Sequence, residues 1–217
     1  MFIEDEKIYT PTHPRIDGAL KTAAIDLDDT LAVSIPNWIS FVNATFPEWY
    51  KVYSGAQKAL YFTNLQQMKK SVPYYFYRIL KENYRNSDVK QNLPPTEGAE
   101  SFLFELKELG YKIIIMTGRK EASLKLTVEW LNKNNLYYDE LVLDKNKHVK
   151  ILQRYPNLSF MVEDNRTVAN LVASWNYRVY LLDNKYNQGN LHQKVVRIYN
   201  KERSFFMQIL DLLQLGE

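Results

Sequence analysis

The stretch TAAIDLDDTLA (Thr22–Ala32) places three carboxylates, Asp26, Asp28 and Asp29, directly after a short apolar run. A run of this kind predicts a buried strand that presents its last residue, Asp26, at the edge of a sheet. Neighbouring carboxylates repel one another and lose hydration near a core, so the cluster needs compensation. A bound divalent cation would provide it. The stretch therefore predicts both a strand and a site.

The residue types in this stretch suit phosphoryl transfer. A fixed carboxylate such as Asp26 can attack phosphorus and form an aspartyl phosphate. A second carboxyl group, Asp28, can donate a proton to the leaving oxygen and later accept one from water. Asp29 is expected to shape the turn. The alternative is a polar turn in which an Asp caps the next helix; the pattern of apolar run, DxDDT and apolar residues favours catalysis.

Further apolar runs do not alternate with polar residues, which predicts strands covered on both faces, as in parallel sheets. Helical patterns lie between them, such as Phe102, Leu106 and Leu109 followed by Gly110, a typical C-terminal cap. This order predicts an α/β fold with a doubly wound parallel sheet, which binds ligands at the carboxyl ends of its strands. The expected strands are Thr22–Asp26, Lys112–Met116, Leu141–Leu143, Ser159–Glu163 and Arg178–Leu182.

Residues 34–92 interrupt the alternation, because they contain no convincing strand and are rich in aromatic residues. Pro36, Pro47 and Pro73 predict that this segment divides into short helices. We therefore expect an N-terminal extension at 1–20, a catalytic core at 21–33 and 93–217, and a helical cap at 34–92. Most cap aromatics should form the core of the cap, with one or two contacting substrate; the candidates are Trp38, Phe41, Trp49, Tyr50, Tyr53, Tyr74 and Tyr77.

Two motifs carry candidate phosphate ligands. In IIIMTGRK (113–120), Thr117 and Gly118 follow a predicted strand, so a hydroxyl and a backbone amide can hold a phosphate, with Arg119 as a further candidate. The alternative is an ordinary strand-to-helix turn. In LDKNKHVK (143–150), a lysine could bind phosphate oxygens. Lys147, at the expected start of a helix, is favoured over Lys145 and Lys150.

The motif SFMVEDNR (159–166) ends another predicted strand with the acidic pair Glu163 and Asp164. Because the carboxyl ends of parallel strands meet at one edge of the sheet, this pair could complete a metal site with Asp26. The alternative is that Asp164 or Asn165 caps the next helix. Both interpretations can hold together.

In this order the motifs resemble those of the haloacid dehalogenase-like superfamily. The DxDxT motif of that family matches Asp26, Asp28 and Thr30, its strand-ending hydroxyl matches Thr117, and its cation and acidic pair match Lys147 and Glu163–Asp164. The resemblance covers about residues 20–185 and implies that the core is the Rossmann-like sheet of this superfamily, with a small helical cap inserted after the first strand. Asp at position 28 implies a phosphatase rather than a dehalogenase.

The resemblance also implies a division of roles. Asp26 would attack phosphorus, and Asp28 would serve as acid and then as base. Mg²⁺ would be held by the Asp26 carboxylate, the Asp28 backbone carbonyl and Asp164, with Glu163 acting through water or as a weaker ligand. The phosphate oxygens would be held by Thr117, Gly118 and Lys147.

The resemblance leaves the substrate open between two classes. LLDNKYN (181–187) resembles a feature of 5′(3′)-deoxyribonucleotidase-like phosphatases, with Lys185 in place of a proline. The residues TGR (117–119) and EDNR (163–166) resemble the phosphatase half of polynucleotide kinase/phosphatase enzymes. A small cap should enclose a small ligand, so a nucleoside monophosphate is preferred over a nucleic-acid 3′ end. A catalytically silent binding module and a phosphotransferase are the further alternatives.

Composition limits the class of protein. The chain has 217 residues, 46% hydrophobic and 24% charged, which suits one domain with an insertion and argues against disorder. A net charge of +3 suits an anionic substrate. There is no cysteine, no secretory signal and no membrane-length apolar run, so a soluble, cytoplasmic protein without a membrane partner is expected. The apolar stripe near the end packs on the sheet or forms a dimer face; it comprises Phe206, Ile209, Leu210 and Leu213.

Overall fold

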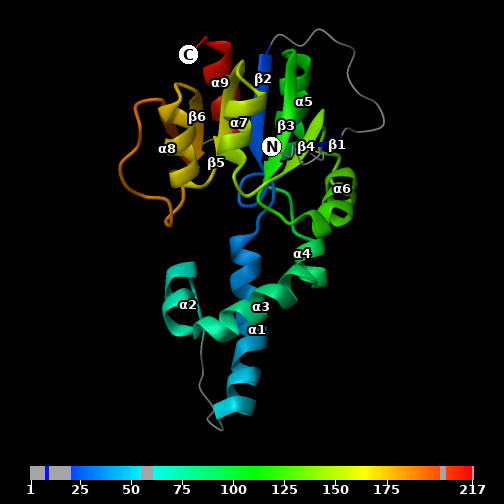
Figure 1. Ribbon diagram of the computed structural model, residues 1–217, viewed down its shortest axis with the longest axis vertical. Coiled ribbons are helices and arrows are strands. Elements are labelled where there is room, and N and C mark those ends of the chain that lie inside the picture. The colour runs from blue at the N-terminus through cyan, green and yellow to red at the C-terminus, as the bar shows by residue number, and fades with distance from the viewer. Residues whose placement is uncertain (1–7, 10–20, 55–60, 201–203, 217) are drawn as a thin grey trace, which may run out of the picture. The chain divides into compact units, whose positions relative to one another are not determined.

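The computed structural model describes residues 8–9, 21–54, 61–200 and 204–216. The chain forms two compact units (Figure 1). The core unit comprises Met1–Leu31 and Pro95–Glu217, and the cap unit comprises Ala32–Pro94. The N-terminal extension predicted at 1–20 lies outside the described residues, except for Ile8–Tyr9. The chain thus leaves the core directly after the DxDDT motif.

Within the described residues, the core unit contains a sheet of seven strands in the order β1-β4-β3-β2-β5-β6-β7. Strands β2 to β7 are parallel, and β1 pairs antiparallel with β4. This confirms the predicted α/β fold, and each predicted strand is present to within one residue at either end. Only β1 and β7 were not predicted. The strands are β1 Ile8–Tyr9, β2 Lys21–Asp26, β3 Tyr111–Thr117, β4 Glu140–Leu143, β5 Leu158–Glu163, β6 Arg178–Leu182 and β7 Val195–Ile198.

Helices cover both faces of this sheet, as a doubly wound fold requires. On one face, α7 and α8 pack against the strands through Ile151 and Val172. On the other, α5 and α9 pack together, and the Phe102 and Phe206 rings stack with centroids 4.6 Å apart. Ile209 is also fully buried, so the C-terminal stripe packs on the core. The helices are α5 Ala99–Glu108, the 3₁₀ turn η1 Glu121–Ser123, α6 Leu124–Lys133, α7 Lys147–Arg154, α8 Arg166–Ser174 and α9 Phe205–Gln214.

The central position of β2 decides where the site lies. The chain moves outward from β2 through β3 to β4, and then returns to the other side of β2 as β5. Open α/β sheets bind ligands at such a reversal, beyond the carboxyl ends of the strands. Asp26, Thr117 and Glu163 are the last residues of β2, β3 and β5. The topology therefore brings three predicted site residues to the same edge.

The cap unit is helical, and one expectation about it is wrong. Pro47 was expected to separate two helices, but it lies inside a single helix, α1, which spans Ile35–Ser54. Proline removes one backbone hydrogen bond within a helix, and here the flanking turns are held by packing of Phe46 and Trp49 into the cap core. Pro73 does mark a boundary, as the N-cap of α3. The other cap helices are α2 Leu65–Ser71, α3 Tyr74–Arg85 and α4 Asp88–Gln91.

Most cap aromatics form the core of the cap, as predicted. Trp38 is 7% exposed and packs against Tyr77 and Tyr84. Phe41, Trp49 and Tyr50 are partly buried against the same cluster. Tyr74 is exposed, and the side chain of Tyr53 lies outside the described residues. No helix among the described residues is long and apolar enough to cross a membrane.

Candidate active site

Asp26 ends β2 as a buried carboxylate, 4% exposed. The Thr30 hydroxyl donates a hydrogen bond to its Oδ2 at 3.2 Å, and Lys147 Nζ contacts its Oδ1. Burial raises the pKa of Asp26 to about 7, although the charge of Lys147 opposes this rise, and the Glu163 carboxylate adds to it. The carboxylate is contacted at both oxygens, which fixes its direction.

Lys147 is the first residue of α7 and is itself buried. Its Nζ lies 2.7 Å from Glu163 Oε2 while it contacts Asp26, so one ammonium group bridges two carboxylates. Burial opposes its charge, but the Asp26 and Glu163 carboxylates outweigh burial and raise the pKa of Lys147. Lys145 is exposed, and Lys150 Nζ is 4.0 Å from Asp144 Oδ2. Of the three candidate lysines, the structure brings Lys147 into the site.

Three carboxylates gather at this edge of the sheet. One oxygen each from Asp26, Glu163 and Asp164 can be chosen so that all lie within 4.8 Å of one another. Burial, followed by the charges of Glu163 and Asp26, raises the pKa of Asp164 well above its ordinary value. Asn165 caps α8 by accepting a hydrogen bond from Thr167 N at 2.9 Å. The acidic pair and the helix cap therefore coexist in EDNR.

This carboxylate cluster fits a divalent cation. Three carboxylates meet one contacting ammonium group, that of Lys147, which leaves an excess of negative charge in a largely buried place. Carboxylate oxygens are the ligands that Mg²⁺ prefers. Glu163 is the least available of the three, because its Oε1 accepts backbone hydrogen bonds from Asp164 (3.2 Å) and Asn165 (2.9 Å) and its Oε2 faces Lys147.

The Asp28 carboxylate forms a separate pair with Arg119. Arg119 Nε donates to Asp28 Oδ2 at 2.9 Å, and Arg119 Nη2 donates to Oδ1 at 2.8 Å. Asp28 belongs to none of the carboxylate groupings that could hold a metal among the described residues. A metal contact from Asp28 would therefore come from its backbone carbonyl, as the family resemblance implies.

The strand end of β3 supplies the predicted phosphate ligands. Thr117 is 1% exposed, and its Oγ1 accepts a hydrogen bond from the backbone amide of Arg119 at 3.3 Å. A Cβ added to Gly118 would meet only Lys145 Cα, at 3.9 Å, which is an ordinary contact. The chain's own packing therefore does not demand glycine at 118. A requirement for glycine at position 118 would come from the close approach of a bound substrate.

Asp29 occupies a backbone conformation that few side chains adopt. Its φ is +63°, in the left-handed region. Asp and Asn tolerate this region better than most residues because their short polar side chains can bond locally. Asp29 therefore has a structural reason to be present in DxDDT, which agrees with the expectation that it shapes the turn.

Sequence reasoning missed a second layer of residues after β6. The Tyr186 hydroxyl donates to Asp164 Oδ2 at 2.7 Å. Asn187, buried to 3% exposure, donates from Nδ2 to the backbone oxygens of Asp164 and Leu182, both at 2.7 Å. Arg197 of β7 donates to Asn187 Oδ1 at 2.7 Å. LLDNKYN was recognised as a resemblance, but nothing in that pattern indicated that its side chains reach Asp164.

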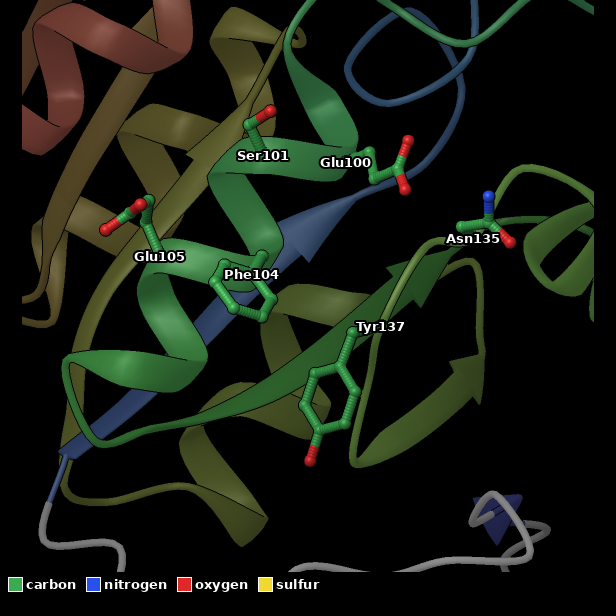
Figure 2. A pocket seen from close by; sticks show the side chains of 6 residues that line it. All are labelled: Glu100, Ser101, Phe104, Glu105, Asn135 and Tyr137. Atoms are coloured by element: carbon green, nitrogen blue, oxygen red, sulfur yellow. The ribbon is translucent and has the colours of Figure 1, made fainter.

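A pocket elsewhere in the core unit contains none of the predicted site residues. It has a volume of about 280 Å³ and lies between the outer side of α5 and the segment before β4 (Figure 2). The predicted chemistry therefore lies apart from this pocket. Its lining residues are Glu100, Ser101, Phe104, Glu105, Asn135 and Tyr137.

Comparison with known proteins identifies the family of the chain. A family model described as haloacid dehalogenase-like hydrolase matches residues 24–166. A nucleotidase of Clostridium acetobutylicum is 25% identical over 179 residues, covering 81% of this chain and 87% of that protein. A Bacillus subtilis protein named as a nucleotidase is 28% identical over 103 residues, which cover 47% of this chain and 53% of that protein.

Solved structures share the fold. A hydrolase of the same family from Deinococcus radiodurans, solved with bound phosphate and sodium, has a TM-score of 0.57 at 15% identity, covering 92% of this chain and 98% of its own. A predicted phosphatase from Clostridium acetobutylicum has a TM-score of 0.57 at 16% identity, covering 88% and 99%. At such low identity these likenesses support the architecture alone.

Proposed function

The chain belongs to the haloacid dehalogenase-like hydrolase family and is a phosphatase, and we propose that it hydrolyses nucleoside monophosphates with Mg²⁺ through a phosphorylated Asp26. The convergence of Asp26, Lys147, Glu163 and Asp164 at the carboxyl end of β2 carries this proposal. A buried, fixed carboxylate is suited to attack phosphorus. Lys147 provides positive charge beside it.

Asp26 and Asp164, with the Asp28 backbone carbonyl, would hold Mg²⁺, and Glu163 would support the ion as a weaker or water-mediated ligand. When bound, the ion would neutralise the charge of the transferring phosphoryl group. The residues of the chain divide the remaining work. Thr117, the Gly118 amide and Lys147 would hold the phosphate oxygens.

The two steps need one nucleophile and one acid–base group. Asp26 would attack phosphorus as the bond to the leaving oxygen breaks, and Asp28 would give that oxygen its proton. Asp28, then a carboxylate, would take a proton from water as the water oxygen attacks the phosphorus on Asp26. Phosphate would leave, and both residues would return to their starting states.

Two observations support a nucleotide as substrate. Both curated relatives reported above are named as nucleotidases. The cap unit also exposes aromatic rings, Tyr61 and Tyr74 among them, at 73% and 75% exposure. Aromatic side chains stack readily on nucleobases.

The charge of the cap favours a second candidate, a phosphatase of nucleic-acid 3′ ends. Residues 32–94 contain eight Lys or Arg and three Asp or Glu, so the cap has a net charge of +5, whereas the whole chain has +3. A polyanion would use such a surface over several phosphates, whereas a mononucleotide offers only one. The two candidates differ in salt dependence.

The test is a substrate panel measured with Mg²⁺ and with EDTA. It contains nucleoside 5′- and 3′-monophosphates, sugar phosphates and a 3′-phosphorylated oligonucleotide. We expect Mg²⁺-dependent release of phosphate, with the highest kcat/KM on a mononucleotide and a weak salt dependence. Higher kcat/KM on the oligonucleotide, falling steeply with salt, would establish the second candidate. Normal turnover by Asp26→Asn would refute the mechanism.

A further inference from the structure

Arg119 is joined to the site by three hydrogen bonds from its guanidinium group. Two run in parallel to Asp28, at 2.9 and 2.8 Å, and the third runs from Nη1 to Thr127 Oγ1 at 3.2 Å. The Arg119 side chain is 11% exposed and that of Asp28 is 30% exposed. This pair is better shielded from water than an ordinary surface ion pair, whose partners are held loosely.

The far end of Arg119 is anchored by α6. Thr127 is fully buried, and its hydroxyl donates to Ser123 O at 2.8 Å, which leaves its oxygen to accept from Arg119. The backbone amide of Arg119 also donates to Thr117 Oγ1. A chain of contacts therefore runs from the first turn of α6 through Arg119 to Asp28. It fixes the guanidinium plane before any substrate arrives.

A bidentate guanidinium fixes both the plane and the direction of a carboxylate, which a single lysine contact cannot do. This matters for Asp28, because a general acid must lie within hydrogen-bond reach of the leaving oxygen. Asp28 already occupies the Nε–Nη2 side of the guanidinium, so a phosphate could be held in that bidentate way only by displacing Asp28. We propose that Arg119 is a positioning residue that holds the Asp28 carboxyl group for proton transfer, rather than a ligand of the transferred phosphate.

The inference rests on the proposed phosphatase mechanism and assigns Arg119 to the proton transfers made by Asp28. In the first step the Asp28 proton moves to the leaving oxygen as its bond to phosphorus breaks. Asp28 becomes a carboxylate, which the Arg119 guanidinium stabilises, and in the second step it takes a proton from water. Arg119 thus acts on the reaction through Asp28 alone. Loss of the Arg119 side chain should therefore slow the reaction only when the leaving oxygen needs a proton.

Substrates with different leaving groups distinguish two roles of Arg119, positioning of Asp28 and binding of the transferred phosphate. An alkyl phosphate such as a nucleoside 5′-monophosphate needs its leaving oxygen protonated, whereas p-nitrophenolate departs without a proton. The ratio kcat/KM includes the steps up to transfer of the phosphoryl group to Asp26. The experiment measures kcat/KM on both esters for the wild type, Arg119→Lys, Asp28→Asn and the double variant. Arg178→Lys, at the start of β6 and so at the opposite edge of the sheet, is the matched control.

We expect Arg119→Lys to lose at least about tenfold more kcat/KM on the alkyl ester than on p-nitrophenyl phosphate, within the range that general acids contribute. In the Asp28→Asn background the same change should have no further effect on the alkyl ester. Thr127→Val should reproduce the pattern more weakly, because it removes the anchor of Arg119. Arg178→Lys should match the wild type on both esters.

Equal losses on both esters with a raised KM, persisting in the Asp28→Asn background, would show that Arg119 binds phosphate and would overturn the inference. Unchanged kinetics of Arg119→Lys on both esters would overturn it too. Thermal unfolding of each variant distinguishes a lost fold from a lost role. If the wild type hydrolysed neither ester, the proposed function itself would be wrong.

Discussion

Replacing Lys147 by methionine should destabilise the metal-free protein strongly, because it leaves two buried carboxylates without their shared counter-charge. Lys147 is 7% exposed and Glu163 is fully buried, with Nζ 2.7 Å from Oε2. At an effective dielectric constant of about 20, charges at that separation attract by roughly 6 kcal/mol. Desolvation of the ammonium group offsets part of this. Removing one partner of a buried pair typically costs about 3–5 kcal/mol.

The assay is urea unfolding in EDTA of the wild type, Lys147→Met, Glu163→Gln and the double variant. We expect the double variant to lose about 2–3 kcal/mol less than the sum of the single losses, because it removes both charges together. A loss of 3–5 kcal/mol corresponds to a fall in Tm of roughly 6–20 °C for a chain of this size. Adding Mg²⁺ should recover part of the loss in Lys147→Met, since a cation that binds the folded state stabilises it.

Lys145→Met is the control, because Lys145 is exposed two residues away and should change stability by less than about 0.5 kcal/mol. Two results would refute the reasoning. One is an effect of Lys147→Met no larger than that of Lys145→Met. The other is a cycle that is additive to within about 0.5 kcal/mol, which would mean that Lys147 and Glu163 do not stabilise each other.

Three further predictions concern single residues. Asp29→Ala should cost about 1 kcal/mol in urea unfolding while Asp29→Asn costs little, because φ is +63°; an activity loss in Asp29→Ala as large as in Asp26→Ala, with both folded, would contradict this. Tyr186→Phe should weaken Mg²⁺ binding by about tenfold in calorimetry, since its hydroxyl orients Asp164; unchanged affinity would contradict it. Without metal, the stability of Asp26→Asn relative to the wild type should rise from pH 4 to 7, since folded Asp26, with a pKa of about 7, keeps a proton that the unfolded chain has already released; a constant difference would contradict it.

The strands of the core could be predicted because each is an unbroken apolar run that ends in polar residues. β7 was missed because the polar residue Arg197 interrupts the apolar run of Val195–Ile198. The boundary expected at Pro47 was wrong for a related reason. Proline disfavours the interior of a helix, but the residues on either side of Pro47 pack against parts of the cap that are distant in sequence. This packing outweighs the one lost hydrogen bond.

Some features of the site could also be predicted from the sequence, whereas others could not. Asp26, Lys147 and the acidic pair could be placed together because parallel strands end at a common edge, whatever their separation along the chain. The pairing of Asp28 with Arg119 could not, because the two are 91 residues apart and their contact depends on side-chain direction. The same holds for Tyr186 and its contact with Asp164. Strand ends can be read from a pattern, whereas the partners of polar side chains follow from packing.

Two of the three carboxylates in the DxDDT motif, Asp26 and Asp28, have different surroundings, which supports the separate roles proposed for them. Asp26 is buried and contacts the ammonium group of Lys147, a compact charge that can also meet phosphate oxygens. Asp28 is 30% exposed and is held in a fork by Arg119. A nucleophile benefits from burial because fewer water molecules compete with it for phosphorus, whereas an acid that later activates water must remain accessible to water. Separate environments for paired carboxyl groups are how sites assign separate acid and base roles. The different cationic partners, Lys147 for Asp26 and Arg119 for Asp28, therefore distinguish the two carboxylates.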